Sequence, residues 1–339
     1  MKFYIPQDTT ALALGAESVA RALQAAGVAP VRNGSRGMFW LEPLLEVETE
    51  QSRIAFGPVS SKDIPSILDA LETEASSHDL YLGPVDQIAY LASQQRLTYV
   101  RAGLGDPVCL DNYQTLNGFK GLKNALTLTG QQIVDQVKDS GLRGRGGAAF
   151  PAGIKWQTVL NCNSEQKYIV CNADEGDSGT FADRLVMEAD PYQLIEGMCI
   201  AGLAVGAAQG YIYLRSEYPV AHKLLNIAIE RAVEANFLGD NIQGSGKTFH
   251  LEVRLGAGAY ICGEETSLLE SLEGKRGMVR AKPPLPAIEG LFGKPTVVNN
   301  VLTLAAISTI LEQGAETYQN FGMGRSRGTL AIQLAGNIK

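Results

Sequence analysis

The chain has 339 residues, of which 45% are hydrophobic, and a formal net charge of −7. This length and apolar fraction are enough for two domains with separate cores. The sequence contains no apolar run of about 20 residues and no signal-peptide pattern. Its acidic balance excludes a broad nucleic-acid surface but allows a local basic pocket for a small anion. We therefore expect a soluble, cytoplasmic protein with no nucleic-acid partner and no membrane segment.

Residues 1–110 are predicted to form a small domain of their own. The periodicity predicts a strand, a helix, two strands and a second helix, at residues 2–6, 11–27, 39–51, 52–57 and 65–76. This order is that of a thioredoxin-like α/β domain, an analogy of fold that by itself implies no function. Because the first cysteine of the chain is Cys109, this unit has no thiol for a redox disulfide or an iron–sulfur cluster.

The five cysteines, at positions 109, 162, 171, 199 and 262, show no CxxC spacing and no pairing with the three histidines. This pattern excludes a local zinc or iron–sulfur motif among them, so we predict no metal site. Free cysteines of this kind are most often reduced and buried in a core. We assign none of them to catalysis.

Residues 111–339 are predicted to form a second domain in which strands alternate with helices. We expect strands at 167–175, 210–219 and 249–265, and helices at 131–140, 154–162, 182–208, 222–236, 267–274 and 301–311. This alternation is typical of an α/β domain with a mostly parallel sheet. In such sheets, ligands bind at the carboxyl ends of the strands.

A glycine-rich loop, SGLRGRGGAAFPAGIKW, runs from Ser140 to Trp156. Its glycines and Pro151 are incompatible with a regular helix or strand. Glycines allow the backbone to approach a ligand, successive N–H groups bind anions, and Arg143, Arg145 and Lys155 add positive charge. We interpret the segment as a phosphate-binding loop.

Two glycine patterns resemble nucleotide motifs but lack the required context. Residues 144–149 match GxGxxA, the dinucleotide-binding pattern, yet a predicted helix precedes them where that motif needs a strand. Residues 244–248, GSGKT, end like a P-loop, but Asn241 stands where the P-loop glycine belongs. We expect a loop tip between a helix and a strand there. A conventional dinucleotide-dependent dehydrogenase and an ATPase are therefore disfavoured.

Acidic residues lie at the ends of two of the predicted strands. Asp174, Glu175 and Asp177 lie at the end of the first, and Glu264 and Glu265 at the end of the third. Carboxylates accept hydrogen bonds from hydroxyls and ring N–H groups and repel phosphates, so ribose or ribityl hydroxyls suit them. The alternatives are a solvated acidic turn for the first group and a helix N-terminus for the glutamate pair. In the same way, Asn300 is either a ligand or the N-cap of the helix at 301–311.

Four motifs in fixed order carry a family resemblance: SGLRGRGGAAFPAGIKW, CNADEGDSGTFADR, GAYICGEETSLLESLEGKRG and KPPLPAIEGLFGKPTVVNN. Over residues 110–339 the chain closely resembles the NADH-binding flavoprotein subunit of respiratory complex I and its soluble relatives. These relatives are the diaphorase subunits of NAD-reducing hydrogenases and of NAD-dependent molybdenum formate dehydrogenases. The cysteine-free N-terminal unit most resembles the formate dehydrogenase β subunit. The alternatives are a hydrogenase or complex I subunit, and a non-catalytic module that binds a partner.

The resemblance implies a Rossmann-like domain with one cavity for FMN, on whose ring NADH stacks and exchanges a hydride. The positions that match the FMN site are Gly144, Gly146, Gly147, Lys155, Asn172, Asp174, Glu175, Tyr260, Gly263, Glu264, Asn299 and Asn300. Those that match the nicotinamide nucleotide site are Phe150, Asp177, Glu265 and Lys282. Glu264 and Glu265 are expected to orient the reactants, and no residue is expected to act as an acid or base.

The chain departs from the family pattern at four positions. Ala149 replaces a common glycine, Asp177 a common glutamate, and Thr158 and Leu285 two aromatics that sandwich adenine, which reduces the stacking available to that ring. The resemblance also implies two partners, an iron–sulfur γ-type subunit with a thioredoxin-like fold and a larger molybdenum- and cluster-containing catalytic subunit. Relatives continue past the final IQLAGNIK into a region with [4Fe–4S] cysteines, so we expect this sequence to be a fragment that lacks the cluster region.

Overall fold

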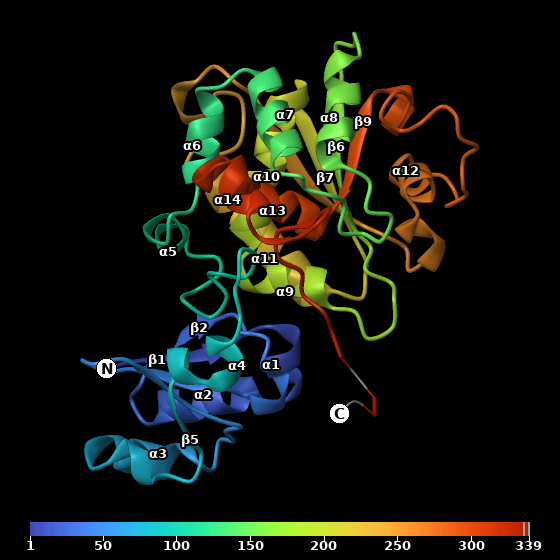
Figure 1. Cartoon of the computed structure of the whole chain (residues 1–339). Helices are drawn as coiled ribbons and strands as arrows, with labels where there is room; N and C mark the ends of the chain where they lie inside the picture. Colours follow the sequence, from blue (N-terminus) through green and yellow to red (C-terminus); the bar gives the residue numbers. More distant parts are fainter. Residues whose placement is uncertain (335, 338–339) are drawn as a thin grey trace.

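The computed structural model describes residues 1–334 and 336–337, so the remaining positions of the predicted second domain lie outside the described residues. A five-stranded mixed sheet, in the order β2-β1-β3-β4-β5, forms the N-terminal unit (residues 1–92). A four-stranded parallel sheet, in the order β8-β7-β6-β9, forms the centre of the larger part of the chain (Figure 1). The predicted α/β class with a mostly parallel sheet is confirmed.

The N-terminal unit contains the predicted elements with corrected bounds, together with further elements. They are β1 (Lys2–Pro6), α1 (Thr9–Ala13), α2 (Ala16–Ala25), β2 (Val31–Asn33), β3 (Leu45–Glu48), β4 (Arg53–Phe56), α3 (Ile64–Glu72), β5 (Tyr81–Pro84) and α4 (Ala89–Ala92). The single helix predicted at 11–27 is wrong, because Gly15 adopts φ +104 and separates α1 from α2. The strand predicted at 39–51 is too long, since Pro43 has no N–H to donate and the strand begins only at Leu45. The edge strands β2 and β5 and the short helix α4 were not predicted.

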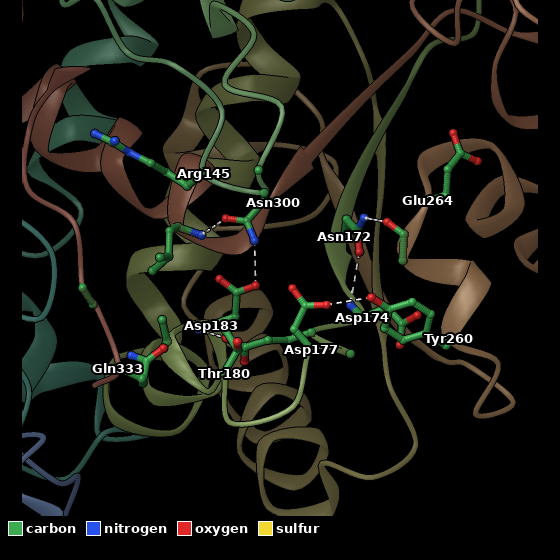
Figure 2. A pocket seen from close by; sticks show the side chains of 18 of the residues that line it. Arg145, Asn172, Asp174, Asp177, Thr180, Asp183, Tyr260, Glu264, Asn300 and Gln333 are labelled. Carbon is green, nitrogen blue, oxygen red and sulfur yellow. Dashed lines mark hydrogen bonds between the residues drawn. The ribbon is translucent and has the colours of Figure 1, made fainter. Parts of the chain in front are cut away.

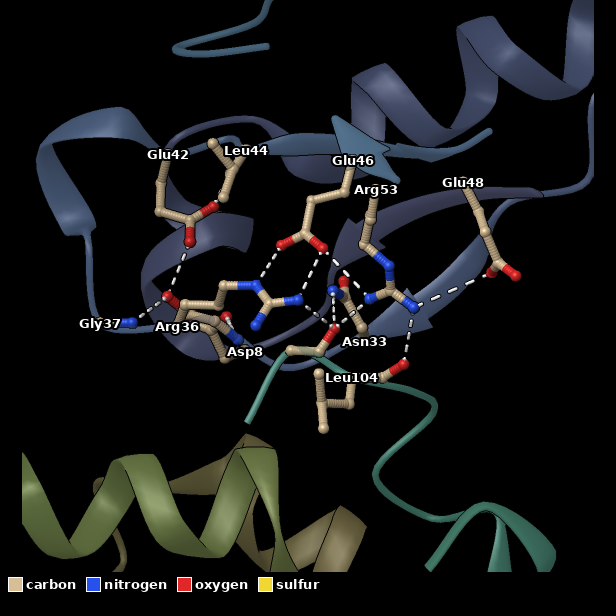
Figure 3. Close-up of polar contacts among 12 residues, drawn as sticks. Asp8, Asn33, Arg36, Gly37, Glu42, Leu44, Glu46, Glu48, Arg53 and Leu104 are labelled. Atoms are coloured by element: carbon tan, nitrogen blue, oxygen red, sulfur yellow. Dashed lines mark hydrogen bonds and ion pairs between the residues drawn. The ribbon is translucent and has the colours of Figure 1, made fainter. Parts of the chain in front are cut away.

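One face of the N-terminal sheet carries a buried charge cluster (Figure 3). Glu46 is buried and accepts hydrogen bonds from Arg36, at 2.6 and 2.9 Å, and from Arg53, at 3.1 Å. Arg53 also donates to the carbonyl oxygen of Gly103 at 2.8 Å. A Cβ at Gly103 would lie 2.5 Å from Cγ of Arg36. The cluster therefore fastens the connector (residues 93–109) to the sheet.

Glu42, at the edge of this cluster, gives the N-terminal unit a pH-dependent stability. It is buried and accepts hydrogen bonds from the Ser35 hydroxyl at 2.7 Å and the Leu44 N–H at 2.9 Å. Burial, with a contribution from the charge of Asp8, raises the pKa of Glu42 from 4.5 to about 8. The folded state therefore holds this proton more tightly than the unfolded chain, and stability falls as the pH rises from about 4.5 to about 8.

We expect Glu42→Gln to flatten this pH dependence. Over that window the free energy of unfolding of the wild type should fall by on the order of 2 kcal/mol more than that of the variant. Urea denaturation at several pH values between the two limits measures the difference. Parallel pH profiles for the two proteins would contradict the expected role of Glu42.

The larger part follows the predicted alternation, with several additions. Its elements are α5 (Leu110–Thr115), α6 (Lys120–Leu126), α7 (Gly130–Asp139), α8 (Ala152–Asn161), β6 (Tyr168–Ala173), α9 (Ala182–Ala189), α10 (Pro191–Val205), β7 (Gln209–Leu214), α11 (Pro219–Glu234), β8 (His250–Leu255), α12 (Glu265–Leu272), β9 (Thr296–Asn300), α13 (Val301–Gln313), α14 (Ala315–Gln319), β10 (Gly322–Met323) and β11 (Ser326–Arg327). The single helix predicted at 182–208 is wrong. Asp190 has a non-helical backbone, with φ −153 and ψ 59, and Pro191 begins a new helix, so α9 and α10 are separate.

The two faces of the parallel sheet pack against different helices. Alternate residues of β6, Ile169 and Cys171, belong to the main core with α10 and α13, whereas Val170 packs with Leu268 and Leu269 of α12 on the other face. Because all four strands are parallel, the carboxyl ends of β6, β7 and β9 meet at one edge. The acidic residues after β6 are thereby brought beside the end of β9.

The remaining expectations concern metals, thiols and membranes. All five cysteines are free, and three of them, Cys171, Cys199 and Cys262, are buried. Across residues 1–334 and 336–337, no group of three His, Cys, Asp or Glu side chains is arranged to hold a metal ion. None of the helices in that part of the chain is both long and apolar enough to cross a membrane. We keep the domain division near residue 110 as a proposal.

Candidate functional site

A pocket of about 620 Å³ lies at the carboxyl edge of the parallel sheet (Figure 2). Its walls come from the glycine loop, the turn after β6, the first turns of α9 and α13, and the segment before α12. Ten of the predicted site residues line it: Gly146, Gly147, Asn172, Asp174, Glu175, Asp177, Tyr260, Gly263, Glu264 and Asn300. Segments far apart in the sequence therefore converge as predicted at the strand ends.

The glycine loop connects α7 to α8 and is held by one hydrogen bond within the loop and one to α13. The N–H of Gly144 donates to the carbonyl of Phe150 at 2.8 Å, which closes the loop, and the N–H of Arg145 donates to the Thr303 hydroxyl of α13 at 2.8 Å. Helix α7, and not a strand, directly precedes the loop, so its GxGxxA pattern is not a conventional dinucleotide motif. Ala149 adopts φ +52, a left-handed conformation that costs an L residue about 1–2 kcal/mol and explains why glycine suits this position.

The loop meets the N-terminus of α13, which makes one end of the pocket favourable for an anion. A Cβ at Gly146 would lie 3.2 Å from Cβ of Asn300, the N-cap of α13. The Asn300 Oδ1 accepts from the N–H of Leu302 at 2.9 Å, and its Nδ2 donates to Asp183 at 2.6 Å. Asn300 is thus both a helix cap and a pocket residue. A helix N-terminus beside glycine backbone is a common phosphate site.

The opposite end of the pocket is acidic. Asn172 donates to the carbonyl of Gly263 at 2.8 Å and accepts from the N–H of Asp174 at 3.2 Å, so it joins the end of β6 to the segment before α12. The half-buried Asp174 has one carboxylate oxygen, Oδ2, that is buried and has no hydrogen-bond partner among the described residues. Burial, opposed by the charge of Arg215, raises the pKa of Asp174 to about 6.

Glu175 and Asp183 form a second acidic pair in the pocket wall. The carboxylate of Glu175 accepts from the N–H groups of Asp183 and Arg184, at 2.9 and 3.0 Å, and from the Tyr218 hydroxyl at 3.1 Å. Burial and the nearby charge of Glu175 raise the pKa of Asp183 well above its ordinary value. Glu175 is therefore fixed by α9 rather than free to rotate.

The glutamate pair at the N-terminus of α12 forms ion pairs with lysines. Glu264 caps α12, accepting from the N–H groups of Thr266 and Ser267 at 2.8 and 3.0 Å. Although partial burial opposes the shift, hydrogen bonds from Thr266 and Lys282 lower the pKa of Glu264 to about 2. Lys282 contacts both glutamates at 2.9 Å. The helix-cap alternative for this pair is thus realised by Glu264, which also lines the pocket.

Six predicted site residues lie outside the pocket wall, namely Gly144, Phe150, Lys155, Glu265, Lys282 and Asn299. Lys155 donates to the carbonyl of Val298 at 2.8 Å and pairs with Glu265 at 3.3 Å, so its ammonium group is directed to the end of β9. Asn299 is buried and accepts from the Trp156 indole at 2.8 Å. Phe150 is 50% exposed beside the loop. Their ligand roles stay predictions.

Several pocket residues were not predicted from the sequence: Arg145 as a lining residue, Thr180, Ala182, Asp183, Ile261, Leu302, Leu330, Ala331 and Gln333. Asp183 lies in the motif CNADEGDSGTFADR, so its position next to the acidic turn was the available signal. Leu330, Ala331 and Gln333 carry no such signal, because they lie outside the four motifs and reach the pocket only through the path of the last described segment (Figure 1).

The pocket fits the cofactor implied by the resemblance. Its anion-favouring end and its acidic end match a molecule with a phosphate at one end and hydroxyl or N–H donors at the other. The unpartnered Oδ2 of Asp174 calls for such a donor, since a buried carboxylate oxygen without one is destabilising. A Cβ added at Gly147 would meet no atom within 4 Å, so the backbone there leaves room for the phosphate end.

Fold and pocket together define a nucleotide-binding α/β protein of the parallel-sheet class. The family model described as Nuo51 FMN-binding domain matches residues 137–309. The chain belongs to this family, as the four sequence motifs predicted, and the prediction of an FMN-binding domain is confirmed. The match includes the glycine loop, both acidic strand ends and Asn300.

Individual relatives agree with the family match. The chain is 50% identical over 246 residues to the NADP-reducing hydrogenase subunit HndC of Solidesulfovibrio fructosivorans, which covers 73% of this chain and 50% of that protein. It is 50% identical over 235 residues to the F subunit of the NADH-quinone oxidoreductase of Escherichia coli K12, covering 69% of this chain and 53% of that protein. The chain thus spans about half the length of these relatives.

A solved structure extends the similarity to the N-terminal unit. An NAD+-reducing [NiFe]-hydrogenase in its H2-reduced state matches with a TM-score of 0.59 and 28% sequence identity, over 96% of this chain and 55% of that one. The similarity therefore includes the N-terminal unit as well as the residues of the family match.

Proposed function

We propose that this chain binds FMN in the pocket and exchanges a hydride between NADH and FMN, within a larger electron-transfer complex. The observation that carries the proposal is the unpartnered Asp174 oxygen in a pocket built from the family's motifs. When bound, FMN supplies a ring that accepts a hydride and passes electrons on singly. The chain's residues supply binding, orientation and electrostatics.

Each group of pocket residues has a distinct part in this proposal. The backbone of Gly146 and Gly147 and the N-terminus of α13 hold the phosphate, while Asn172, Asp174 and Glu175 accept from hydroxyl and ring donors. Tyr260 and Asp177 both line the pocket, and the Tyr260 hydroxyl donates to Asp177 at 2.7 Å. In this proposal both lie beside the approach of a second nucleotide. The proposed positions for that nucleotide remain Phe150, Asp177, Glu265 and Lys282.

We infer the physiological electron donor from the relatives and not from the N-terminal unit. The relatives reported above are subunits of hydrogenases and of NADH-quinone oxidoreductase. They favour a complex I or NAD-reducing hydrogenase subunit over the formate dehydrogenase assignment, which they do not support. We accordingly propose iron–sulfur partner subunits in general and do not retain the molybdenum-containing subunit.

Reconstitution tests the proposal directly. The purified chain, incubated with FMN and freed of excess by gel filtration, should retain a visible flavin absorption band and reduce ferricyanide with NADH. A chain that retains no flavin would refute the FMN site. A chain that retains flavin but shows no NADH-dependent reduction would instead support the non-catalytic partner-binding module.

A further inference from the structure

We propose that the N-terminal unit holds the cofactor pocket in shape through α9, with Glu188 and Thr9 as positioning residues. This inference rests on the proposed FMN site. Helix α9 lies between the N-terminal unit and the parallel sheet (Figure 1). Its first turn lines the pocket, and its last turn contacts the N-terminal unit.

The first turn of α9 fixes two predicted FMN residues. The N–H groups of Asp183 and Arg184 hold both carboxylate oxygens of Glu175, at 2.9 and 3.0 Å. Asp183 in turn accepts from Nδ2 of Asn300 at 2.6 Å (Figure 2). The orientation of Glu175 and Asn300 therefore depends on where the N-terminus of α9 lies.

The last turn of α9 is fixed by the N-terminal unit. Glu188 is 1% exposed, and its two oxygens accept from the N–H and the hydroxyl of Thr9, at 2.7 and 2.6 Å. Next to it, Ala189 packs against the backbone of Gly34, where an added Cβ would lie 2.5 Å from Cβ of Ala189. Arg184 also donates to the Thr10 hydroxyl at 3.1 Å. These contacts join residues that are far apart in the sequence.

The chemistry of the Glu188 contact favours positioning over simple adhesion. An apolar contact between the two parts would bury surface area without fixing the orientation of α9. A carboxylate that accepts two hydrogen bonds from one residue fixes both the distance and the angle between the two residues. Helix α9 has eight residues, a length of about 12 Å at about 1.5 Å per residue. So short a helix moves as a rigid body, so a displacement at Glu188 is transmitted to Asp183.

The connector supports the same helix from a second side. The Tyr99 hydroxyl donates to the carbonyl of Ala182, at the first turn of α9, at 2.9 Å. Arg101 pairs with Asp190, directly after the last turn, at 2.8 Å. Phe39 of the N-terminal unit stacks edge to face on Phe181, directly before the first turn, with ring centroids 4.9 Å apart. Both ends of α9 are therefore set from outside the parallel-sheet part.

Two variants test the inference in the full chain. Glu188→Gln keeps the side-chain shape but turns an amide donor toward Thr9, and Gly34→Ala inserts a methyl group against Ala189. Glu74→Gln is the matched control, because the exposed Glu74 accepts one hydrogen bond from Ser76 in the same unit, away from α9. The measurements are FMN affinity by flavin fluorescence, the visible circular dichroism of bound flavin, and hydrogen exchange of the apoprotein.

We expect both variants to weaken FMN binding by about tenfold and to alter the flavin circular dichroism, with the control unchanged. In the apoprotein, the amides of Asp183 and Arg184 should exchange about tenfold faster. Lower thermal stability with unchanged FMN affinity and unchanged exchange would overturn the inference and leave a structural contact. If the wild type binds no FMN, the proposed function fails, and the exchange rates still decide the role of α9.

Discussion

Asp174→Asn is expected to weaken FMN binding by about 10–100-fold and, at the same time, to stabilise the cofactor-free protein. The Oδ2 atom is buried without a partner among the described residues, so in the apoprotein it costs free energy that a ligand donor would recover. A hydrogen bond to a charged acceptor contributes about 1.5–3 kcal/mol, which corresponds to the expected loss of affinity. Flavin fluorescence titration measures it.

The stability effect of Asp174→Asn has a defined pH dependence. The pKa of this half-buried carboxyl is raised from 3.8 to about 6, so its burial penalty is absent near pH 3.8 and complete above about pH 6. After allowance for solvent screening, we expect the variant apoprotein to be about 1 kcal/mol more stable than the wild type at pH 8. The two apoproteins should be about equally stable near pH 4.

Asp177→Asn is the matched control for Asp174→Asn. It changes a carboxylate three residues away that is exposed and already accepts from Tyr260 at 2.7 Å. Its effect on apoprotein stability should be small. If Asp174→Asn destabilised the apoprotein at pH 8, the carboxylate would have a structural partner. If the variant left FMN affinity unchanged, the carboxylate would have no part in cofactor binding.

Local patterns in the sequence were sufficient to predict the class of fold and half of the residues that line the pocket. The glycine loop and the acidic strand ends are contiguous in sequence, and the parallel sheet brings their ends to one edge whatever the details of packing. Glu264 and Asn300 each had two interpretations, a helix cap and a ligand. Both side chains are caps that also line the pocket, so the two interpretations were compatible.

What could not be predicted depends on contacts between distant residues. Asp183 follows the pattern of an acidic residue in a first helical turn, and its side chain is held in the pocket wall by Asn300, 117 positions later. Thr9 and Glu188 are separated by 179 positions. The break between α9 and α10 was missed because apolar residues recur at helical spacing on both sides of Pro191. The proline ring ends a preceding helix but is tolerated in the first turn of a new one.

Arg101→Met is expected to lower the free energy of unfolding by about 3–5 kcal/mol, the largest stability change that we predict. Arg101 and Asp190 are both buried, with side chains 9% and 5% exposed, and their charged atoms lie 2.8 Å apart. The guanidinium also lies over the Tyr113 ring, 4.6 Å from its centroid. Removal of Arg101 leaves Asp190 as a buried charge without its partner.

Urea denaturation measures the loss of stability in Arg101→Met. Arg21→Met is the control, because Arg21 pairs with Glu17 on the exposed surface and its removal should change stability by less than about 1 kcal/mol.

Two further measurements separate the lost ion pair from lost packing in Arg101→Met. Burial already acts to raise the pKa of Asp190, and without the opposing charge of Arg101 the pKa must rise further. The variant's deficit should therefore be largest near pH 8 and shrink toward pH 5, as Asp190 takes up a proton. Adding Asp190→Asn should recover about 2 kcal/mol at pH 8, because it removes the unpaired charge. A deficit that does not change with pH, or no recovery in the double variant, would contradict the role of the ion pair. Arg101 would then stabilise the chain by packing its aliphatic stem and its guanidinium plane on Tyr113. The ion pair would contribute little to the fixed position of α9.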